Sequence, residues 1–180
     1  MFVLIFFSPK VGSNDVLCES IKKIETNKKE FVNSKKAIEH FEKSNSEDCN
    51  FVVDTSTWYR ASASHYNALD SSQTKENPDG VGAFGRRIRS GSIALGSSIT
   101  KTLVKKNLVA FIEVEDLKDV ETPYGKGIFR VDDMMGDKFS KDDKFYVDFN
   151  QHDLNQELKR RGRFKIRFRF ISFHPARSLS

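Results

Sequence analysis

The most regular pattern of apolar and polar positions lies near the end of the chain, in residues 164–170. Apolar and basic residues alternate there: the apolar ones are Phe164, Ile166, Phe168 and Phe170, and those between them are Lys165, Arg167 and Arg169. Side chains of a β-strand point to opposite faces in turn, so strict alternation gives one apolar and one basic face. The pattern predicts a strand that is buried on one side and basic on its outer side.

Several other short segments have the composition of strands, because they are rich in β-branched and aromatic residues. They cover residues 51–64, 90–96, 108–117, 128–131 and 145–149. One short helix is expected within residues 152–162, with Gly162 at its end. Many short strands, one helix and no internal repeat favour a β-barrel over alternating strands and helices. We therefore predict a mainly β domain over residues 50–180.

The segment before this domain has the pattern of a helix. Between residues 19 and 43 there is no Gly or Pro, and apolar residues recur at spacings of three and seven, at Ile21, Ile24, Phe31, Ile38 and Phe41. Such a stripe predicts a helical extension over residues 18–49, ended by a polar run at 44–50. We expect it to pack on the domain or act as a spacer, because two partial heptads are too few for a coiled coil.

The first 17 residues have two interpretations. Residues 2–7, FVLIFF, followed by Ser8 and Pro9, are typical of the end of a secretory signal. No basic residue precedes them, and they are too short to span a bilayer. They are either a truncated signal, which we favour, or a buried N-terminal strand. A signal implies an exported protein of the periplasm or cell envelope, attached to a membrane only through that signal or a lipid.

Two cysteines, Cys18 and Cys49, flank the predicted helical extension. In an exported chain an even number of cysteines indicates one disulfide, whereas in a cytosolic chain the two would be free thiols. Lipid modification of Cys18 is a third alternative. It is disfavoured because Val16 and Leu17 precede the cysteine, where small residues would be expected.

The composition is that of a globular protein with a modest positive charge. The 180 residues include 31% charged and 38% hydrophobic residues, and the formal net charge is +5. Much of the excess lies in the last quarter, at Lys159, Arg160, Arg161, Arg163, Lys165, Arg167 and Arg169. Such a patch favours an anionic partner, either nucleic acid or an acidic polymer of the cell envelope. We expect no nucleic-acid partner, because no aromatic stacking residues are interleaved on the basic face.

Candidate chemistry is concentrated in residues 125–150, which are typical of a strand, an acidic loop and a second strand. Asp132 and Asp133 end the first strand, and Asp148 lies between Val147 and Phe149 in the second. A carboxylate is costly to bury, so Asp148 is expected to point away from its apolar neighbours, towards solvent or a cleft. An ordinary solvated Asp is the alternative.

No pattern indicates a metal or a cofactor. Gly80, Gly82 and Gly85 are not followed by the helix of a phosphate-binding loop. The histidines at 65, 152 and 174 share no ligand spacing, and the acidic residues at 132–143 lack the order of a calcium loop. We expect neither a metal site nor a cofactor.

Five segments, taken in order, resemble a known family. They are TWYRASAS (57–64), SIALG (92–96), TPYGKG with GIFRVDDMM (122–135), FYVDFN (145–150) and KRRGRFKIRFRFI (159–171). Together they resemble the three-aspartate domain, a double-psi β-barrel found in membrane-bound lytic transglycosylase A and related to rare lipoprotein A and the expansins. The resemblance covers residues 51–173. It implies a six-stranded double-psi β-barrel, which the helical extension precedes.

The resemblance also implies site residues. The strand that carries the catalytic carboxylate of the transglycosylase is similar to Val147–Asp148, and a second groove carboxylate falls on Asp133. Substrate-binding positions fall on Trp58, Tyr59, Asp132 and Tyr146, where the first two would stack on sugars or else be core aromatics. The first of the family's three aspartates is absent, because Leu95, Gly96 and Ser97 follow the expected Ile-Ala pair.

The function implied by the resemblance is cleavage of peptidoglycan by one aspartate that acts first as acid and then as base. An acid of this kind needs a raised pKa, which apolar neighbours and a second carboxylate would supply. The alternative is a non-catalytic, expansin-like barrel that binds a polysaccharide. In either case we expect a monomer whose partner is a cell-wall glycan.

Overall fold

The computed structural model describes residues 22–24, 52–54, 56–67, 70, 80–96, 98–139 and 144–175. The predicted signal, the two cysteines and most of the predicted helical extension lie outside these residues. Lys22–Ile24 form a short strand, β1, which pairs in parallel with β2 (Val52–Asp54). The helical prediction is therefore wrong at these three positions, where the backbone hydrogen-bonds to another strand instead of to its own turn.

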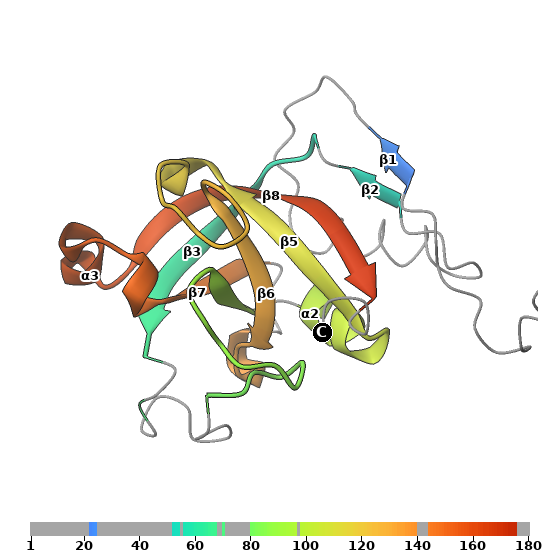
Figure 1. The fold of residues 1–180 in the computed structure, drawn as a ribbon, viewed down its shortest axis with the longest axis horizontal. Helices are drawn as coiled ribbons and strands as arrows, with labels where there is room; N and C mark the ends of the chain where they lie inside the picture. Colours follow the sequence, from blue (N-terminus) through green and yellow to red (C-terminus); the bar gives the residue numbers. More distant parts are fainter. Residues whose placement is uncertain are drawn as a thin grey trace, which may run out of the picture.

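Six strands close into one barrel (Figure 1). They are β3 (Tyr59–Tyr66), β4 (Ser92–Gly96), β5 (Leu108–Val114), β6 (Ile128–Met134), β7 (Phe145–Asn150) and β8 (Phe164–Pro175). Around the barrel the order is β3-β7-β4-β6-β5-β8, and β8 pairs again with β3. The prediction of a mainly β, six-stranded barrel is confirmed.

The strand order has an internal two-fold symmetry. Exchanging β3 with β6, β4 with β7 and β5 with β8 leaves the set of neighbours unchanged. The two parallel pairs, β3–β7 and β4–β6, exchange with each other, and the other four pairs are antiparallel. The first and second halves of the barrel are therefore built in the same way.

The barrel interior is filled mainly by aromatic and branched side chains. On β8 the alternation predicted from the sequence places Ile166, Phe168 and Phe170 inside, with 4% or less of each exposed. Phe145 and Phe168 meet edge to face, with ring centroids 5.1 Å apart. Burying one such ring stabilises the fold by roughly 1.5–3 kcal/mol. The many phenylalanines of the second half thus form the centre of the core.

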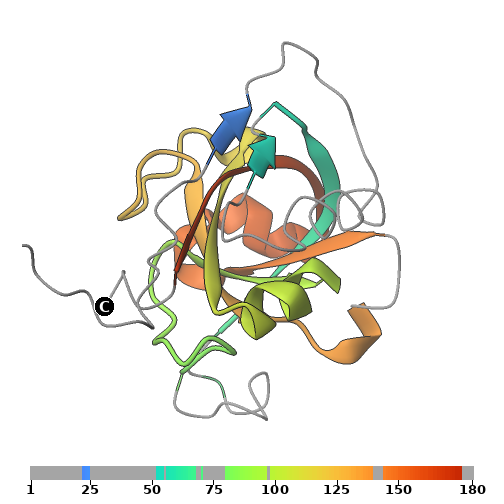
Figure 2. The ribbon, with the colours of Figure 1, turned by 90° about the vertical axis from the view of Figure 1, so that its right-hand side faces the viewer.

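A helix that sequence analysis missed lies at the rim of the barrel (Figure 2). This helix, α2 (Ser98–Lys105), buries Ile99 and Leu103, four residues apart on one face, and exposes Val104. Its eight residues include several β-branched ones, which favour strands in isolation, so packing on the barrel decides its conformation. Of the helices in the described residues, none has the length and apolar character needed to cross a bilayer.

The remaining predictions differ from the structure at element boundaries. The segment expected as one strand at 51–64 is divided between β2, which pairs with β1, and β3, which joins the barrel. The strand expected to reach residue 117 ends at Val114 and continues as a 3-10 helix, η1 (Glu115–Leu117). Two further 3-10 helices are η2 (Asp137–Phe139) and η3 (Gln151–Asp153). The predicted helix before Gly162 is confirmed as α3 (Gln156–Arg161).

Candidate functional site

The two predicted acidic residues lie on the same face of the sheet, on either side of β4. Ala94 of β4 pairs with Asp148 of β7 on one side and with Asp133 of β6 on the other. Because its neighbours Ile93 and Leu95 fill the barrel, Ala94 faces outward, and so do both acidic residues. Two strand spacings separate their backbones by about 10 Å. We call this surface the outer carboxylate face: Ser64, Tyr66, Asp133, Tyr146 and Asp148.

Asp148 is held among apolar residues and one hydroxyl. Val147 and Phe149 are fully buried inside the barrel, and Asp148 itself is partly buried on the outer face. Ser64, its direct neighbour on β3, donates a hydrogen bond of 2.8 Å from Oγ to Oδ1 of Asp148. Burial raises the pKa of Asp148, the Ser64 hydrogen bond and His65 lower it, and the charge of Asp133 raises it again, with a net rise. The protonated acid is thus favoured relative to an exposed Asp.

Asp133 is anchored by backbone N–H groups. Its Oδ1 accepts hydrogen bonds of 2.8 Å from the N–H groups of Ala83 and Met134. The first of these comes from the loop at 80–88, which packs closely on β6 at Gly82. A Cβ at Gly82 would lie 2.1 Å from the carbonyl oxygen of Asp132, so only glycine fits there. The loop therefore fixes the orientation of the second carboxylate.

A β-bulge decides which of the two adjacent aspartates belongs to the face. On β6, Val131 pairs with Ile93 but Asp133 pairs with Ala94, so Asp132 is an extra residue in the ladder. Strict alternation from the buried Val131 would have pointed Asp133 into the barrel. Because Asp132 is inserted, the side chain of Asp133 points to the outer face instead.

Asp132 does not reach the surface. Its exposed fraction is 0%, and its carboxylate contacts Nε of Arg130 at 2.7 and 2.8 Å and accepts a hydrogen bond of 2.6 Å from Ser92 Oγ. Both hydrogen bonds go to Oδ2, whereas the buried Oδ1 has the ionic contact with Arg130 but no hydrogen-bond partner among the described residues. The expected contact of Asp132 with substrate is therefore not available in this structure, because other residues cover it completely.

Trp58 and Tyr59 are also buried, at 7% and 8% exposed. The Tyr59 ring lies inside the barrel, 5.1 Å from the ring of Phe145 and 5.5 Å from that of Phe168, measured between centroids. The guanidinium of Arg169 lies over Trp58, 5.0 Å from the ring centroid. Their burial agrees with the core-aromatic alternative and leaves neither ring on the outer carboxylate face.

Tyr146 lies on the predicted face, next to a residue that sequence analysis passed over. Tyr66 is buried there with Ala94 and Met135, and Tyr146 packs against this cluster. Among the described residues the Tyr66 hydroxyl has no hydrogen-bond partner. Burial raises its pKa strongly, and the charges of Asp133 and Asp148 raise it further, so the hydroxyl keeps its proton. Tyr66 is two residues beyond Ser64, and the predicted strand was too short to include it.

The face thus combines an acid whose protonated form is favoured, a second carboxylate and a protonated phenol. This set can transfer a proton to a bound oxygen atom and take one back. In the described part of the chain no three His, Cys, Asp or Glu residues come together as metal ligands. A scan against models of protein families and a search of curated proteins gave no match to this chain.

Proposed function

We propose that this chain acts on a cell-wall glycan, and that Asp148 is the general acid and base that cleaves it. The observation that carries the proposal is the position of Asp148. It lies beside Asp133 on one outer face of the barrel, and burial favours its protonated form. A general acid needs a raised pKa, and partial desolvation together with a like charge nearby shifts the pKa of Asp148 in that direction.

The proposal includes a double-psi topology for the barrel. Its support is the two-fold symmetric strand order with two parallel pairs, β3–β7 and β4–β6, each of which joins a strand of the first half to a strand of the second. The resemblance to the three-aspartate domain points to the same arrangement. In that family the groove on the barrel's surface binds the glycan, and the outer carboxylate face is the corresponding surface here.

In the proposed reaction Asp148 gives its proton to the oxygen that links muramic acid to the next glucosamine. The bond from the muramic anomeric carbon to that oxygen breaks, and the glucosamine leaves with a hydroxyl group. The carboxylate of Asp148 then takes the proton of a hydroxyl on the same muramic acid, and that oxygen bonds to the anomeric carbon. One C–O bond is broken and one is formed, the proton is returned, and no water is consumed.

The neighbouring groups have supporting roles in this reaction. Ser64 holds one oxygen of Asp148 at 2.8 Å and so orients the carboxyl group. The charge of Asp133 raises the pKa of Asp148 and stabilises positive charge that develops on the sugar ring. Because the N–H groups of Ala83 and Met134 bind Oδ1 of Asp133, this residue is fixed in place before substrate arrives.

The test is digestion of purified peptidoglycan by the full chain, with products separated by chromatography and identified by mass. We expect the wild type to release muropeptides that end in an anhydro sugar. Asp148→Asn should lower the rate by at least about a hundredfold, as expected for loss of a general acid. Asp119→Asn, at an exposed position outside the face, is the matched control and should retain full activity. A fully active Asp148→Asn protein would refute the proposed role.

A second candidate function is glycan binding without cleavage, as in the expansins. Two observations favour it: the family's first aspartate is missing from the strand that holds Ala94, and Asp133 already has two backbone partners on one oxygen. This alternative predicts that wild type and Asp148→Asn sediment equally well with insoluble peptidoglycan and that neither releases soluble sugar. Release of anhydro products by the wild type alone would exclude it.

A further inference from the structure

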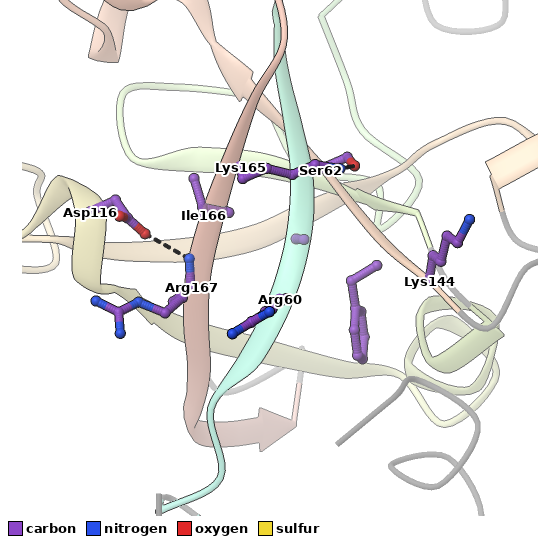
Figure 3. Close-up of a pocket in the computed structure, with 9 residues that line it drawn as sticks. Arg60, Ser62, Asp116, Lys144, Lys165, Ile166 and Arg167 are labelled. Atoms are coloured by element: carbon purple, nitrogen blue, oxygen red, sulfur yellow. Dashed lines mark hydrogen bonds between the residues drawn. The ribbon is translucent and has the colours of Figure 1, made fainter. Parts of the chain in front are cut away.

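A cationic pocket of about 620 Å³ lies on the outside of the barrel, over β3 and β8 (Figure 3). Its lining residues are Arg60, Ala61, Ser62, Asp116, Lys144, Phe145, Lys165, Ile166 and Arg167. Pockets of this size hold small organic ligands or one or two units of a polymer. The pocket includes much of the basic strand face that the sequence predicted.

Positive charge dominates the pocket walls, with four cationic residues and one carboxylate. Arg60 of β3 stands directly opposite Arg167 of β8 in the antiparallel ladder. Like charges at opposite positions of two strands are unfavourable unless an anion joins them. Glu115 accounts for one such contact, 2.9 Å from the Arg167 guanidinium. An anionic group bound in the pocket would be a further counter-charge.

The carboxylate of the lining belongs to Asp116. It accepts a hydrogen bond of 2.7 Å from the backbone N–H of Arg167, which Figure 3 shows as a dashed line. Lys165 extends from β8 across to β3, where its Nζ donates a 2.6 Å hydrogen bond to Ser62 Oγ. The Lys165 ammonium is therefore positioned by a neutral hydroxyl and keeps its charge for a ligand, whereas the Arg167 guanidinium shares its charge with Glu115.

The floor of the pocket is formed by core residues. Ala61, Phe145 and Ile166 line it from the barrel side, with only 2% of each exposed, so they offer a small apolar area to a ligand. An apolar floor with cationic walls suits a ligand that has a carbon-rich body, such as a sugar ring, and one or more anionic substituents. Inorganic ions alone would not need such a floor.

The pocket adjoins the outer carboxylate face along β3. Ser62 of the pocket and Ser64 beside Asp148 are alternate residues, so they point to the same side and lie about 7 Å apart along the strand. Tyr146, opposite Ser62 on β7, stands between the two regions. A glycan bound over Asp148 therefore reaches the pocket with its next sugar or with a substituent on the same sugar.

We propose that this pocket binds a carboxylate or phosphate group carried by the glycan, so that the substrate is an acidic rather than a neutral polysaccharide. This inference rests on the proposed function, because a glycan is expected at the pocket only if the neighbouring Asp148 acts on one. Arg60, Lys165 and Arg167 bind the anionic group, and the apolar floor contacts the sugar that carries it. Lys144 at the start of β7 extends the cationic wall.

The experiment measures binding by the full chain carrying Asp148→Asn, so that turnover does not change the ligand. The probes are soluble muropeptides with free carboxylates, the same muropeptides with amidated carboxyl groups, polyglycerol phosphate, neutral chitohexaose and a short DNA duplex. Adding Lys165→Gln with Arg167→Gln removes two cations of the pocket. Adding Lys105→Gln with Lys126→Gln removes two exposed cations elsewhere and is the matched control.

We expect the pocket variant to bind free-carboxylate muropeptides or polyglycerol phosphate about tenfold more weakly, and the control to stay within about twofold. The probe that binds more tightly of these two shows whether the pocket prefers a carboxylate or a phosphate. Equal affinity for free and amidated muropeptides, with no binding of polyglycerol phosphate, would overturn the proposal. So would unchanged binding by the pocket variant, or tighter binding of DNA than of either the free-carboxylate muropeptides or polyglycerol phosphate.

If the pocket variant does not fold, as judged by its melting temperature, the single change Arg60→Gln replaces it, because Arg60 is exposed. This change should weaken binding about threefold, and no effect would overturn the proposal. Failure of the proposed function is a separate result. Wild type that binds acidic muropeptides through the pocket but cleaves none refutes only the cleavage, whereas cleavage with unchanged binding in the pocket variant refutes only the pocket.

Discussion

Asp148 takes its chemical character from side chains on neighbouring strands. The core residues Val147 and Phe149 fix the direction in which it points, and Ser64 from β3 supplies its hydrogen bond. The rise in its pKa comes first from burial and second from the charge of Asp133, against the opposing effect of Ser64 and His65. Arg163 also lowers this pKa, but the loss of solvent outweighs these opposing effects, so the carboxyl group stays protonated to a higher pH than an exposed one.

This rise predicts how stability depends on pH. A folded-state pKa above the unfolded value means that the folded protein binds the extra proton, so stability falls as pH rises from the unfolded value of about 4 through the folded pKa. Asp148→Asn has no charge to bury, and its amide oxygen still accepts from Ser64. We expect the variant to be more stable than wild type at pH 7, by about 0.5–1.5 kcal/mol, and to lose this advantage near pH 3.

Thermal melting of both proteins across that pH range measures the difference. The control is Asp119→Asn, the same substitution at an exposed position outside the outer carboxylate face. A difference between Asp148→Asn and wild type that is constant with pH, or that grows in acid, would contradict the proposed environment of Asp148.

Gly82 offers a second test at the residue scale. A Cβ at this position would lie 2.1 Å from the backbone oxygen of Asp132, and the loop would have to move away from β6 and from Asp133. We expect Gly82→Ala to destabilise the fold by about 1–3 kcal/mol, the usual cost of overpacking. Gly136→Ala, where a Cβ meets nothing within 4 Å, should change stability by less than about 0.5 kcal/mol. Denaturant unfolding compares the two, and equal stabilities would contradict the close packing of the loop.

The sequence could predict single residues only where the strand pattern is regular. The face of Asp148 follows from Val147 and Phe149, because the alternation there has no interruption. The roles of Asp132 and Asp133 depend on one bulge, which has no signal in a single sequence. Tyr66 was missed for a different reason: the predicted strand ended at Ser64, because residues 60–65 contain no β-branched or aliphatic side chain larger than Ala, whereas β3 continues to Tyr66.

At the scale of the elements, composition predicted strands better than it predicted helix α2 or strand β1. The alternation of β8 extends over seven residues and leaves one interpretation, whereas Ser98–Lys105 contains Ile99, Thr100 and Thr102, which favour a strand. Two buried side chains four residues apart make the helix stable only once the barrel is present. In a short element, packing against the rest of the fold therefore determines the conformation more than local propensity does.

The packing of α2 gives a matched pair of adjacent substitutions. Leu103 is completely buried, whereas Val104 is 37% exposed. We expect Leu103→Ala to lower the free energy of unfolding by about 2–5 kcal/mol, as for other buried leucines. Val104→Ala should change it by about 0.5 kcal/mol or less. Urea unfolding followed by fluorescence measures both, and a similar loss in the two variants would show that α2 does not pack through its Leu103 side.

At the scale of the whole molecule, the closed barrel assembles the candidate site from distant parts of the chain. The hydrogen bond between Ser64 and Asp148 joins residues 84 positions apart, and β4 lies between Asp148 on one side and Asp133 on the other. The same strand β3 carries both the outer carboxylate face and the cationic pocket. This arrangement supports one extended binding surface for an acidic polymer that crosses β3 and β7.

The proposed action on a cell-wall glycan also includes export of the protein to the cell envelope. We propose export from the apolar run at residues 2–7, which is typical of the end of a secretory signal, and from the proposed cell-wall substrate. The similarity of five segments over residues 51–173 to the three-aspartate domain is the basis of the same proposal. The closed six-stranded barrel is the part of this account that the structure confirms.

The most direct test of the central claim is peptidoglycan digestion in water enriched in oxygen-18, with products analysed by mass spectrometry. The account predicts anhydro-ended muropeptides that contain no oxygen-18, because a muramic hydroxyl and not water attacks the anomeric carbon. It also predicts that these products disappear with Asp148→Asn and persist with Asp119→Asn. Products that carry one solvent oxygen, or equal release by the Asp148→Asn protein, would contradict it.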